Sequence, residues 1–262
     1  MTEALTAAAR LGPYFAWTPW DGSARWRPFR ELLDPRVVAE RVELGRDTLA
    51  RMSGLDRGAI GERAVASITF LGLASRLLSP LLGAATIGGA IPRADPGQLW
   101  WQPVTGGPLP IAYRDLTAEP CAGWEPRRIA EAGLLDLVEP LLTVFRERYS
   151  LSPQVLWGNV ASALGGAAGM IADAPSPATG MIADGQPSPA ARSAAIVEAA
   201  LDLAPLRRSA DLVRPDPRRD RWFLVRRNCC LYYRIPGGGT CGDCVLTPEA
   251  ERHRTWRAVL SR

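Results

Sequence analysis

The sequence predicts an α+β fold that is predominantly helical, with a small β element and a short cysteine-bearing segment at the C-terminal end. Three observations support this class. Long stretches place apolar side chains at helical spacing, two aromatic and β-branched runs flank a Gly-Gly pair, and four of the five cysteines fall between Cys229 and Cys244. With 262 residues, 47% of them hydrophobic, the chain can bury a large core. We expect a helix-rich domain over residues 1–213 and a C-terminal segment over residues 214–262.

The N-terminal half is predicted to alternate irregular segments with helices. Residues 1–30 hold three tryptophans among prolines and glycines, which is typical of an irregular segment that packs on a core through its aromatic side chains. A helix is expected from Pro35 to Met52, because valines and leucines recur at helical spacing and a proline suits the first turn. Gly61 to Leu82 predicts a longer buried helix or a pair of helices, and Gly97 to Asp115 predicts a hairpin.

The C-terminal half predicts four more helices. They are expected over residues 127–149, 151–173, 189–206 and 248–260. The first is amphipathic, and the second can begin at a Ser152 cap with Pro153 in its first turn. Between the third and fourth helices, RWFLVRR at residues 221–227 predicts a strand that leads into the cysteine segment.

Two short segments between these elements have a distinctive composition. RPDPRRDR at residues 214–221 is polar and contains prolines, so it is the expected boundary between the two parts of the chain. GMIADAPSPAT begins at Gly169, and GMIADGQPSPA follows at Gly180. A single repeat of this length is too small for a solenoid unit, and its Pro and Ser content predicts a loop insertion.

The charge and hydropathy of the sequence limit which partners and which cellular location are expected. The formal net charge is +4, and every one of the 31 basic residues is arginine. These arginines are spread among acidic residues and form no single basic arm, so we expect no nucleic-acid partner. Residues 1–10 lack the apolar and basic regions of a signal peptide, which predicts a cytoplasmic protein. Arg76 interrupts the most hydrophobic region and leaves runs too short for a spanning helix, although peripheral membrane association stays open.

The cysteine segment reads NCCLYYRIPGGGTCGDC from Asn228 to Cys244. In a reducing compartment, clustered thiols indicate metal or redox chemistry and not a disulfide framework. Soft sulfur ligands suit both zinc and iron-sulfur clusters. Adjacent residues of a strand point to opposite faces, so Cys229 and Cys230 crowd a single zinc ion, whereas a [2Fe-2S] cluster is a larger target. An iron-sulfur cluster, a zinc site and a thiol redox pair all remain open on this chemistry alone.

The spacing of the cysteines is more specific than their chemistry. CC, ten residues and then CxxC resembles the C-terminal signature of the FhuF-like ferric siderophore reductases, and the surrounding CCLYYRIPGGGTCGDCVL is similar as well. Upstream, LASRLLSPLLGAA from Leu73 resembles the family's helix with an Arg and a Ser-Pro, and LWGNVASAL from Leu156 resembles its Trp-Gly-Asn segment. Together these stretches extend the resemblance over most of the chain.

The resemblance implies a cytoplasmic ferric siderophore reductase. A [2Fe-2S] cluster would be bound by Cys229, Cys230, Cys241 and Cys244, and the substrate would be a ferric siderophore of the hydroxamate type. One-electron reduction would release the iron, because the oxygen donors of a siderophore hold Fe(II) far more loosely than Fe(III). No nicotinamide or flavin site is evident in the sequence, so an external donor such as a ferredoxin or a flavoprotein reductase is expected to supply the electrons.

Four residues outside the cysteines are candidates for contact with the substrate. They are Arg76, Trp157, Asn159 and Arg234. A buried guanidinium in an apolar helix needs partners, so Arg76 is either a satisfied structural ion pair or a contact to siderophore oxygens or to the cluster. Trp157 and Asn159 either pack in the core or line the same cavity.

Three guanidiniums lie close to the cysteines in the sequence. They belong to Arg226, Arg227 and Arg234. Either they form a solvated face, or they raise the potential of a negatively charged cluster and attract an acidic ferredoxin. Cys121 is expected to be a small packed residue, because four ligands are already supplied.

Two alternatives to the reductase follow from the same residues. In the first, the helical domain is a siderophore-binding module and the cysteines hold a structural zinc ion, which would stabilise the fold directly. In the second, the protein is an iron-sulfur redox carrier or sensor that binds no siderophore. Metal and sulfide content separate the first alternative from the reductase, and siderophore-dependent turnover separates the second.

Overall fold

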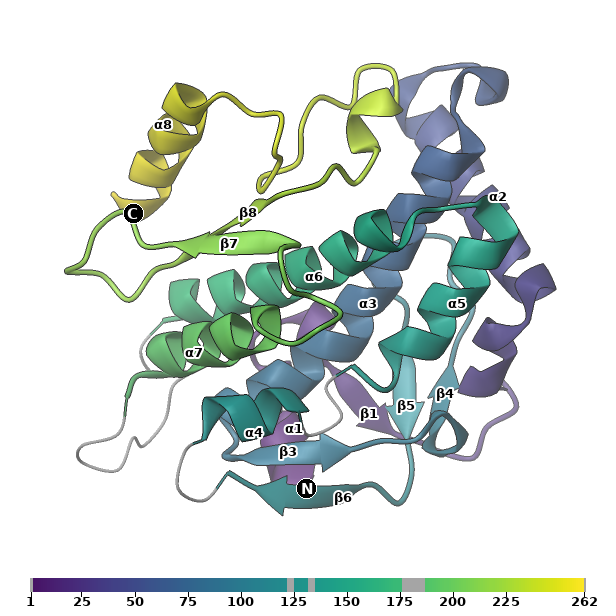
Figure 1. Cartoon of the computed structure of the whole chain (residues 1–262). Coiled ribbons are helices and arrows are strands. Elements are labelled where there is room, and N and C mark those ends of the chain that lie inside the picture. The colour runs from purple at the N-terminus through teal and green to yellow at the C-terminus, as the bar shows by residue number, and fades with distance from the viewer. Residues whose placement is uncertain (1, 122–124, 132–134, 176–186, 262) are drawn as a thin grey trace.

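The structure is a computed structural model, and it describes residues 2–121, 125–131, 135–175 and 187–261 (Figure 1). The chain is mostly helical with a few small sheets, which confirms the α+β class. The α-helices of the described residues are α1 (Thr2–Ala9), α2 (Pro35–Ser53), α3 (Glu62–Thr86), α4 (Pro126–Glu131), α5 (Val138–Tyr149), α6 (Pro153–Asp173), α7 (Pro189–Leu201) and α8 (Glu249–Leu260).

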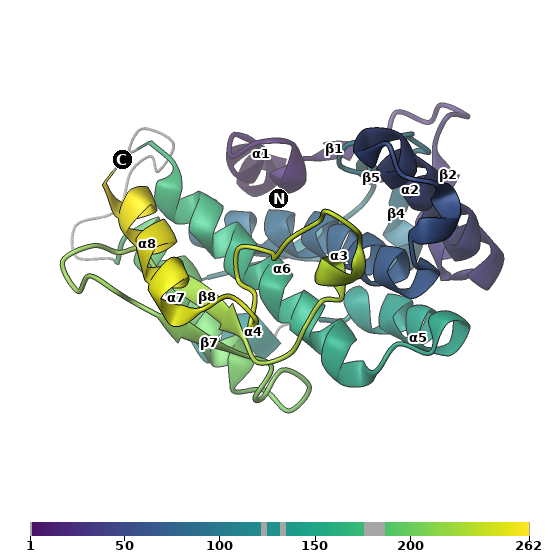
Figure 2. The ribbon, with the colours of Figure 1, turned by 90° about the horizontal axis from the view of Figure 1, so that it is seen from above.

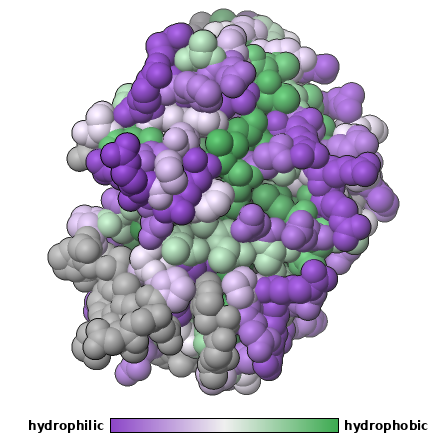
Figure 3. Space-filling model, turned by 60° about the vertical axis from the view of Figure 1, so that its left-hand side comes forward, coloured by the Kyte–Doolittle hydropathy of each residue, from purple (hydrophilic) through white to green (hydrophobic). Residues whose placement is uncertain are grey.

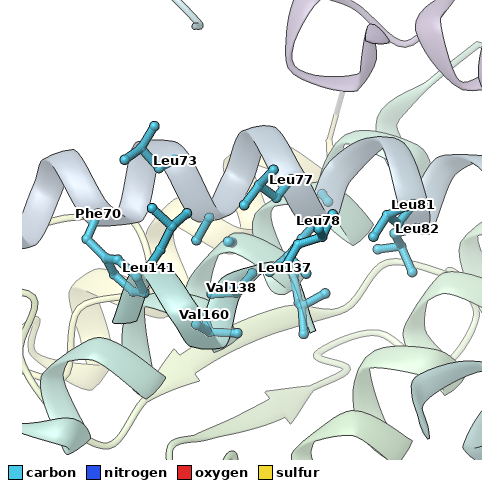
Figure 4. Close-up of a cluster of buried hydrophobic side chains, with 14 of the residues drawn as sticks. Phe70, Leu73, Leu77, Leu78, Leu81, Leu82, Leu137, Val138, Leu141 and Val160 are labelled. Carbon is cyan, nitrogen blue, oxygen red and sulfur yellow. The ribbon is translucent and has the colours of Figure 1, made fainter. Parts of the chain in front are cut away.

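Helices α3 and α6 pack side by side through the centre of the molecule (Figures 1 and 2). Helix α3 is one continuous helix, although Pro80 lies inside it. Its apolar side chains form a core with those of α5 and α6, and Figure 4 shows Phe70 and Leu73 together with Leu141 and Val160 in this cluster. Because the core lies along these two helices, the other segments pack against them.

The expected helix starts are confirmed at α2 and α6. The Asp34 side chain accepts a hydrogen bond from the Arg36 N–H at 2.8 Å, and Pro35 occupies the first turn of α2. The hydroxyl of Ser152 accepts one from the Val155 N–H at 3.3 Å at the start of α6. Each cap satisfies a backbone donor that the helix itself leaves without a partner.

The strands of the described residues form three small sheets. The strands are β1 (Trp17–Pro19), β2 (Arg27–Pro28), β3 (Ala90–Arg93), β4 (Leu99–Trp101), β5 (Ile111–Tyr113), β6 (Thr117–Pro120), β7 (Ala210–Val213) and β8 (Phe223–Arg226). The order of the largest sheet is β1-β5-β4-β2, and β3 pairs with β6 and β7 with β8. The predicted hairpin is confirmed, since β4 and β5 are antiparallel with Trp101 opposite Ile111. Trp101 is buried, while Trp100 stacks on Trp20 with ring centroids 4.4 Å apart.

Several predicted elements differ from the structure. Residues 1–30 were expected to be irregular, but Thr2–Ala9 is a helix, because an alanine-rich segment has a high helix propensity and Leu5 and Ala8 bury themselves in the core. The helix expected over residues 127–149 is two helices, α4 and α5. Helix α7 ends at Leu201 and not at residue 206. The first GMIAD copy is the last turn of α6, and most of the second lies outside the described residues.

Two helices, α3 and α6, are long and apolar enough to cross a membrane by length and composition. In the most hydropathic part of each, 72% and 61% of the residues are buried inside the protein. On the face drawn in Figure 3, hydrophobic residues gather in a band between two hydrophilic regions. Peripheral membrane association stays a prediction.

The C-terminal part of the chain lies across α6. Strands β7 and β8 form an antiparallel hairpin, and α8 packs on it through Trp256, whose ring stacks on Phe223 at 5.2 Å. Figure 2 shows the segment after β8 crossing above α6 towards α3, where Tyr232–Arg234 form a short 3-10 helix, η6. The connection between β7 and β8 is the polar segment expected as a domain boundary, and the division at this point stays a prediction.

Candidate metal centre

The chain between Cys230 and Cys241 doubles back through residues with left-handed backbone. Leu231, Gly237 and Gly239 have φ angles of 69°, 74° and 71°. Two of the three are glycines, which adopt this region without steric cost. The reversal brings the sulfur of Cys230 to 3.6 Å from the sulfur of Cys241, although ten residues separate them in the sequence.

Two backbone amides point at cysteine sulfurs. The Leu231 N–H donates to Sγ of Cys229 at 3.3 Å, and the Leu246 N–H donates to Sγ of Cys244 at 3.3 Å. In both cases the donor lies two residues after the cysteine. Amide hydrogen bonds to sulfur stabilise a thiolate and are among the interactions that set the potential of an iron-sulfur cluster.

The thiols are close enough to change one another's pKa. The hydrogen bond between Cys230 and Cys241 lowers the pKa of Cys230 and raises that of Cys241, so the pair shares one proton. Burial raises the pKa of Cys229, and the neighbouring thiols of Cys230 and Cys244 raise it further. All four cysteines are free thiols, and Cys230 and Cys244 are buried.

This donor set fits a binuclear cluster. Two thiolates bound to one metal at about 2.3 Å in tetrahedral geometry lie about 3.8 Å apart, close to the distance between Cys230 and Cys241. Cys229 and Cys244 are near enough for their charges to interact. A [2Fe-2S] cluster takes four thiolates, which is the number of cysteines in this segment. Within the described residues, no three Cys, His, Asp or Glu side chains are arranged around a point that could hold a single metal ion.

Helix α6 supports the cysteine segment at a very short distance. A Cβ atom on Gly158 would overlap the side chain of Asn228, the residue before Cys229, and one on Gly165 would lie 2.6 Å from Leu224 of β8. Glycine at these two positions lets the backbone of α6 contact the segment directly. The glycine of the Trp-Gly-Asn stretch therefore allows this close contact, a role that its sequence pattern did not indicate.

A chain of buried polar groups links α3, α6 and β8. The amide nitrogen of Asn159 donates to the carbonyl of Ser67 at 2.8 Å and to its hydroxyl at 3.0 Å. Its amide oxygen accepts a hydrogen bond from Nη2 of Arg226 at 2.7 Å. Asn159 is fully buried, and Arg226 is only 1% exposed. Asn159 thus positions Arg226 below the cysteines, a role that its neighbours in the sequence do not reveal.

Arg76 lies on α3, and its guanidinium donates hydrogen bonds to backbone carbonyls. Nε donates to Leu109 at 2.6 Å, Nη1 to Pro13 and Tyr14, and Nη2 to Ala16 at 2.7 Å. Burial lowers the pKa of the guanidinium to about 10, which leaves it charged at neutral pH. Neutral carbonyls therefore satisfy the guanidinium of Arg76, which agrees with a structural role. No ion pair of this residue occurs among the described residues.

The other candidate residues lie nearer to the cysteines. Trp157 precedes Gly158 on α6 and is half-buried against the core. Arg234 is exposed on η6, where it stacks on the ring of Tyr233 at 5.8 Å, and its charge interacts with Cys229. Arg227 is exposed and paired with Asp211 through two hydrogen bonds. The structure thus brings Asn159 and Arg234 to the cysteine segment but leaves Arg76 in a separate environment.

An open cleft of 360 Å³ borders the second pair of cysteines. Its wall includes Gly242 and Asp243, which lie between Cys241 and Cys244 in the sequence. The opposite walls come from α6, β8 and α8, with the aromatic side chains of Trp222, Phe223 and Trp256. A group bound in this cleft would contact the loop that carries the cysteines.

Fold and site together define an iron-sulfur protein whose thiolates are carried by one C-terminal segment. Residues 226–246 match the family model described as the FhuF 2Fe-2S C-terminal domain, which confirms the resemblance over this segment. The matched domain binds a 2Fe-2S cluster, so the cofactor is a [2Fe-2S] cluster. No curated protein matches the chain. The upstream resemblances from Leu73 and Leu156 lie outside the matched residues and stay predictions.

The close contact at Gly158 gives a testable prediction. We expect Gly158→Ala to destabilise the protein by about 1 to 3 kcal/mol, because the added methyl group must displace Asn228. Gly166→Ala is the matched control in the same helix, since a Cβ there meets nothing within 4 Å and alanine favours a helix by up to about 1 kcal/mol. Thermal unfolding of both variants measures the difference. Equal stability of the two variants would contradict the contact.

Proposed function

We propose that this protein is a ferric siderophore reductase that transfers one electron to siderophore-bound Fe(III) and releases Fe(II) in the cytoplasm. The observation that carries the proposal is the presence of four free thiols, two of them accepting hydrogen bonds from backbone amides, in the segment that matches the 2Fe-2S domain. The residues that would hold the cluster are Cys229, Cys230, Cys241 and Cys244. A [2Fe-2S] cluster supplies one-electron chemistry at the potential that its surroundings set.

The substrate of the proposed reaction is a ferric siderophore of the hydroxamate type. The balance of the reaction is one electron from an external donor to Fe(III), which becomes Fe(II) while the siderophore keeps its covalent structure. The cleft beside Gly242 and Asp243 is the proposed docking place, because its aromatic wall suits the apolar parts of an organic chelator and its floor contacts the cysteine loop. Of the candidate substrate residues, Arg234 is exposed beside the cysteines and can donate hydrogen bonds to the hydroxamate oxygens.

The electron donor is proposed to be an acidic electron-transfer protein such as a ferredoxin, or a flavoprotein reductase. Tyr233, Val245 and Leu246 are exposed apolar side chains in the cysteine segment, and Arg234 is an exposed cation among them. An apolar patch with a basic residue suits a transient contact with an acidic partner, whose association would weaken as salt is added. Cys229 and Cys241 are half-buried at this surface, so the path for an electron is short.

The first test is a spectrum of the anaerobically purified protein, with iron, sulfide and zinc measured on the same sample. We expect a red-brown protein with two irons and two sulfides per chain, whose colour bleaches with dithionite and returns when a ferric hydroxamate is added. Fe(II) captured by a chelating dye should appear in proportion to the returning colour. A colour that returns without Fe(II) release would contradict the reductase.

The zinc-binding module and the redox carrier are distinguished in the same experiment. A colourless protein with one zinc and no sulfide would favour the module, for which the close pair of Cys230 and Cys241 is equally suitable. A coloured protein that is reoxidised at the same rate with and without ferric siderophore would favour the carrier or sensor.

A further inference from the structure

Arg226 is a buried cation whose partners in the described residues are all neutral. Nη2 donates to Oδ1 of Asn159 at 2.7 Å and to Oδ1 of Asn228 at 3.2 Å, and Nε donates to the carbonyl of Asn228 at 3.2 Å. The residue is 1% exposed, so water does not compensate its charge. Burying a charge that no opposite charge balances costs several kcal/mol.

One nitrogen of this guanidinium is also left without an acceptor. Nη1 is buried and makes no hydrogen bond among the described residues, although an unsatisfied buried donor costs about 1 to 3 kcal/mol. No carboxylate of the described residues forms an ion pair with Arg226. The ion pairs that other arginines form lie mostly at the surface. Arg226 therefore has an uncompensated positive charge and an N–H donor without an acceptor, and both suit an anionic partner.

The cysteine segment is the anionic group that Arg226 faces. Strand β8 ends at Arg226, whose backbone N–H donates to the carbonyl of Asp243 at 3.0 Å, between Cys241 and Cys244 in the sequence. This bond joins the end of β8 to the loop between Cys241 and Cys244, and the guanidinium contacts Asn228, the residue before Cys229. Through Asn228, the guanidinium is held directly beside the first pair of cysteines.

The other two arginines of the segment differ from Arg226. Arg227 is exposed, and the carboxylate of Asp211 neutralises it at 2.5 and 2.7 Å. Arg234 is exposed to water, which screens its charge. Arg226 alone of the three is in a region of low dielectric, where a charge acts more strongly on its neighbours.

We propose that Arg226 is the buried counter-charge of the [2Fe-2S] cluster, held in place by Asn159, and that it raises the reduction potential of that cluster. The inference rests on the proposed function, because it assumes that the cluster accepts an electron. A cluster with four thiolates is negatively charged and becomes more so on reduction, so a fixed cation stabilises the reduced state more than the oxidised state. The effect belongs to the charge and does not depend on whether a siderophore is bound.

The test is a potentiometric titration of the cluster in the full chain, followed by its visible spectrum. We expect Arg226→Gln to make the cluster at least tenfold harder to reduce, which is a fall of 59 mV or more for a one-electron couple. Arg226→Lys keeps the charge but loses the guanidinium geometry, so it should retain most of the parental potential. Arg227→Gln is the matched control, since its charge is exposed and already paired, and its potential should equal that of the parent.

Two further variants keep the proposal testable if Arg226→Gln does not retain a cluster. Asn228→Asp places a carboxylate at the position that accepts from Nη2, and it should lower the potential. Asp243→Asn removes a negative charge from the loop between Cys241 and Cys244, and it should raise the potential. Equal potentials in Arg226→Gln and Arg226→Lys, or a parental potential in Asn228→Asp, would overturn the proposal. A parent without any cluster would overturn the proposed function as well.

Discussion

Replacing any one of the four clustered cysteines by serine is expected to abolish the visible spectrum and reduce bound iron and sulfide by at least tenfold. The reason is that a serine hydroxyl is a harder and far less acidic ligand than a thiolate. Cys230→Ser and Cys241→Ser should be the most damaging, because these two sulfurs already lie 3.6 Å apart. Iron, sulfide and zinc analysis of each purified variant measures the effect.

Cys121→Ser is the control for these variants. Cys121 is half-buried beside the small sheet of β3 and β6, away from the cysteine segment, and burial raises the pKa of its thiol. The Cys121→Ser variant should keep the metal content of the parent. Parental iron and colour in Cys230→Ser or Cys244→Ser would show that the four-thiolate site is wrong.

Replacing Arg76 by methionine is expected to destabilise the protein by about 3 to 5 kcal/mol, with no change in iron or sulfide per folded chain. The methionine fills part of the volume but donates no hydrogen bond, so the carbonyls of Pro13, Tyr14, Ala16 and Leu109 lose their donors inside the protein. For a chain of this size, the loss should lower the midpoint of thermal unfolding by roughly 10 °C. Circular dichroism during heating measures it.

The comparison with Arg127→Met separates this structural role from a general effect of lost charge. Arg127 forms an exposed ion pair with Glu131 one turn away, and such pairs contribute less than about 1 kcal/mol. Unchanged stability of Arg76→Met together with a weaker siderophore affinity would instead support the role in substrate contact that its sequence position left open.

The helical frame could be predicted because its signals are local. The Asp34 and Ser152 caps, the prolines that follow them and the apolar spacing of α3 and α6 determine these helices with little help from the rest of the chain. Helix α1 was missed because tryptophans and glycines further along dominate residues 1–30, while its own alanines become helical through packing on α3. Sequence spacing also gave no sign that the amphipathic stretch over 127–149 divides into two helices.

The cysteines were predictable, but the residues that place them were not. Their spacing is a signal within one short segment, whereas the contacts of Asn159 join residues 92 and 67 positions apart in the chain. Such long-range partners leave no local pattern in a single sequence. Arg226 was grouped with two exposed arginines for the same reason, since burial depends on α6 covering it and not on its neighbours in the sequence.

The bridge from Ser67 through Asn159 to Arg226 connects the helical core to the strand that precedes the cysteine segment. Its inner links lie wholly within the packed pair α3 and α6, so they form when the helical body folds and need no iron. The hairpin of β7 and β8 can pack against the glycines of α6, which places the cysteine segment against the folded helices. A zinc finger depends on its metal for its fold, whereas this chain has a large apolar core of its own against which the cysteine segment packs.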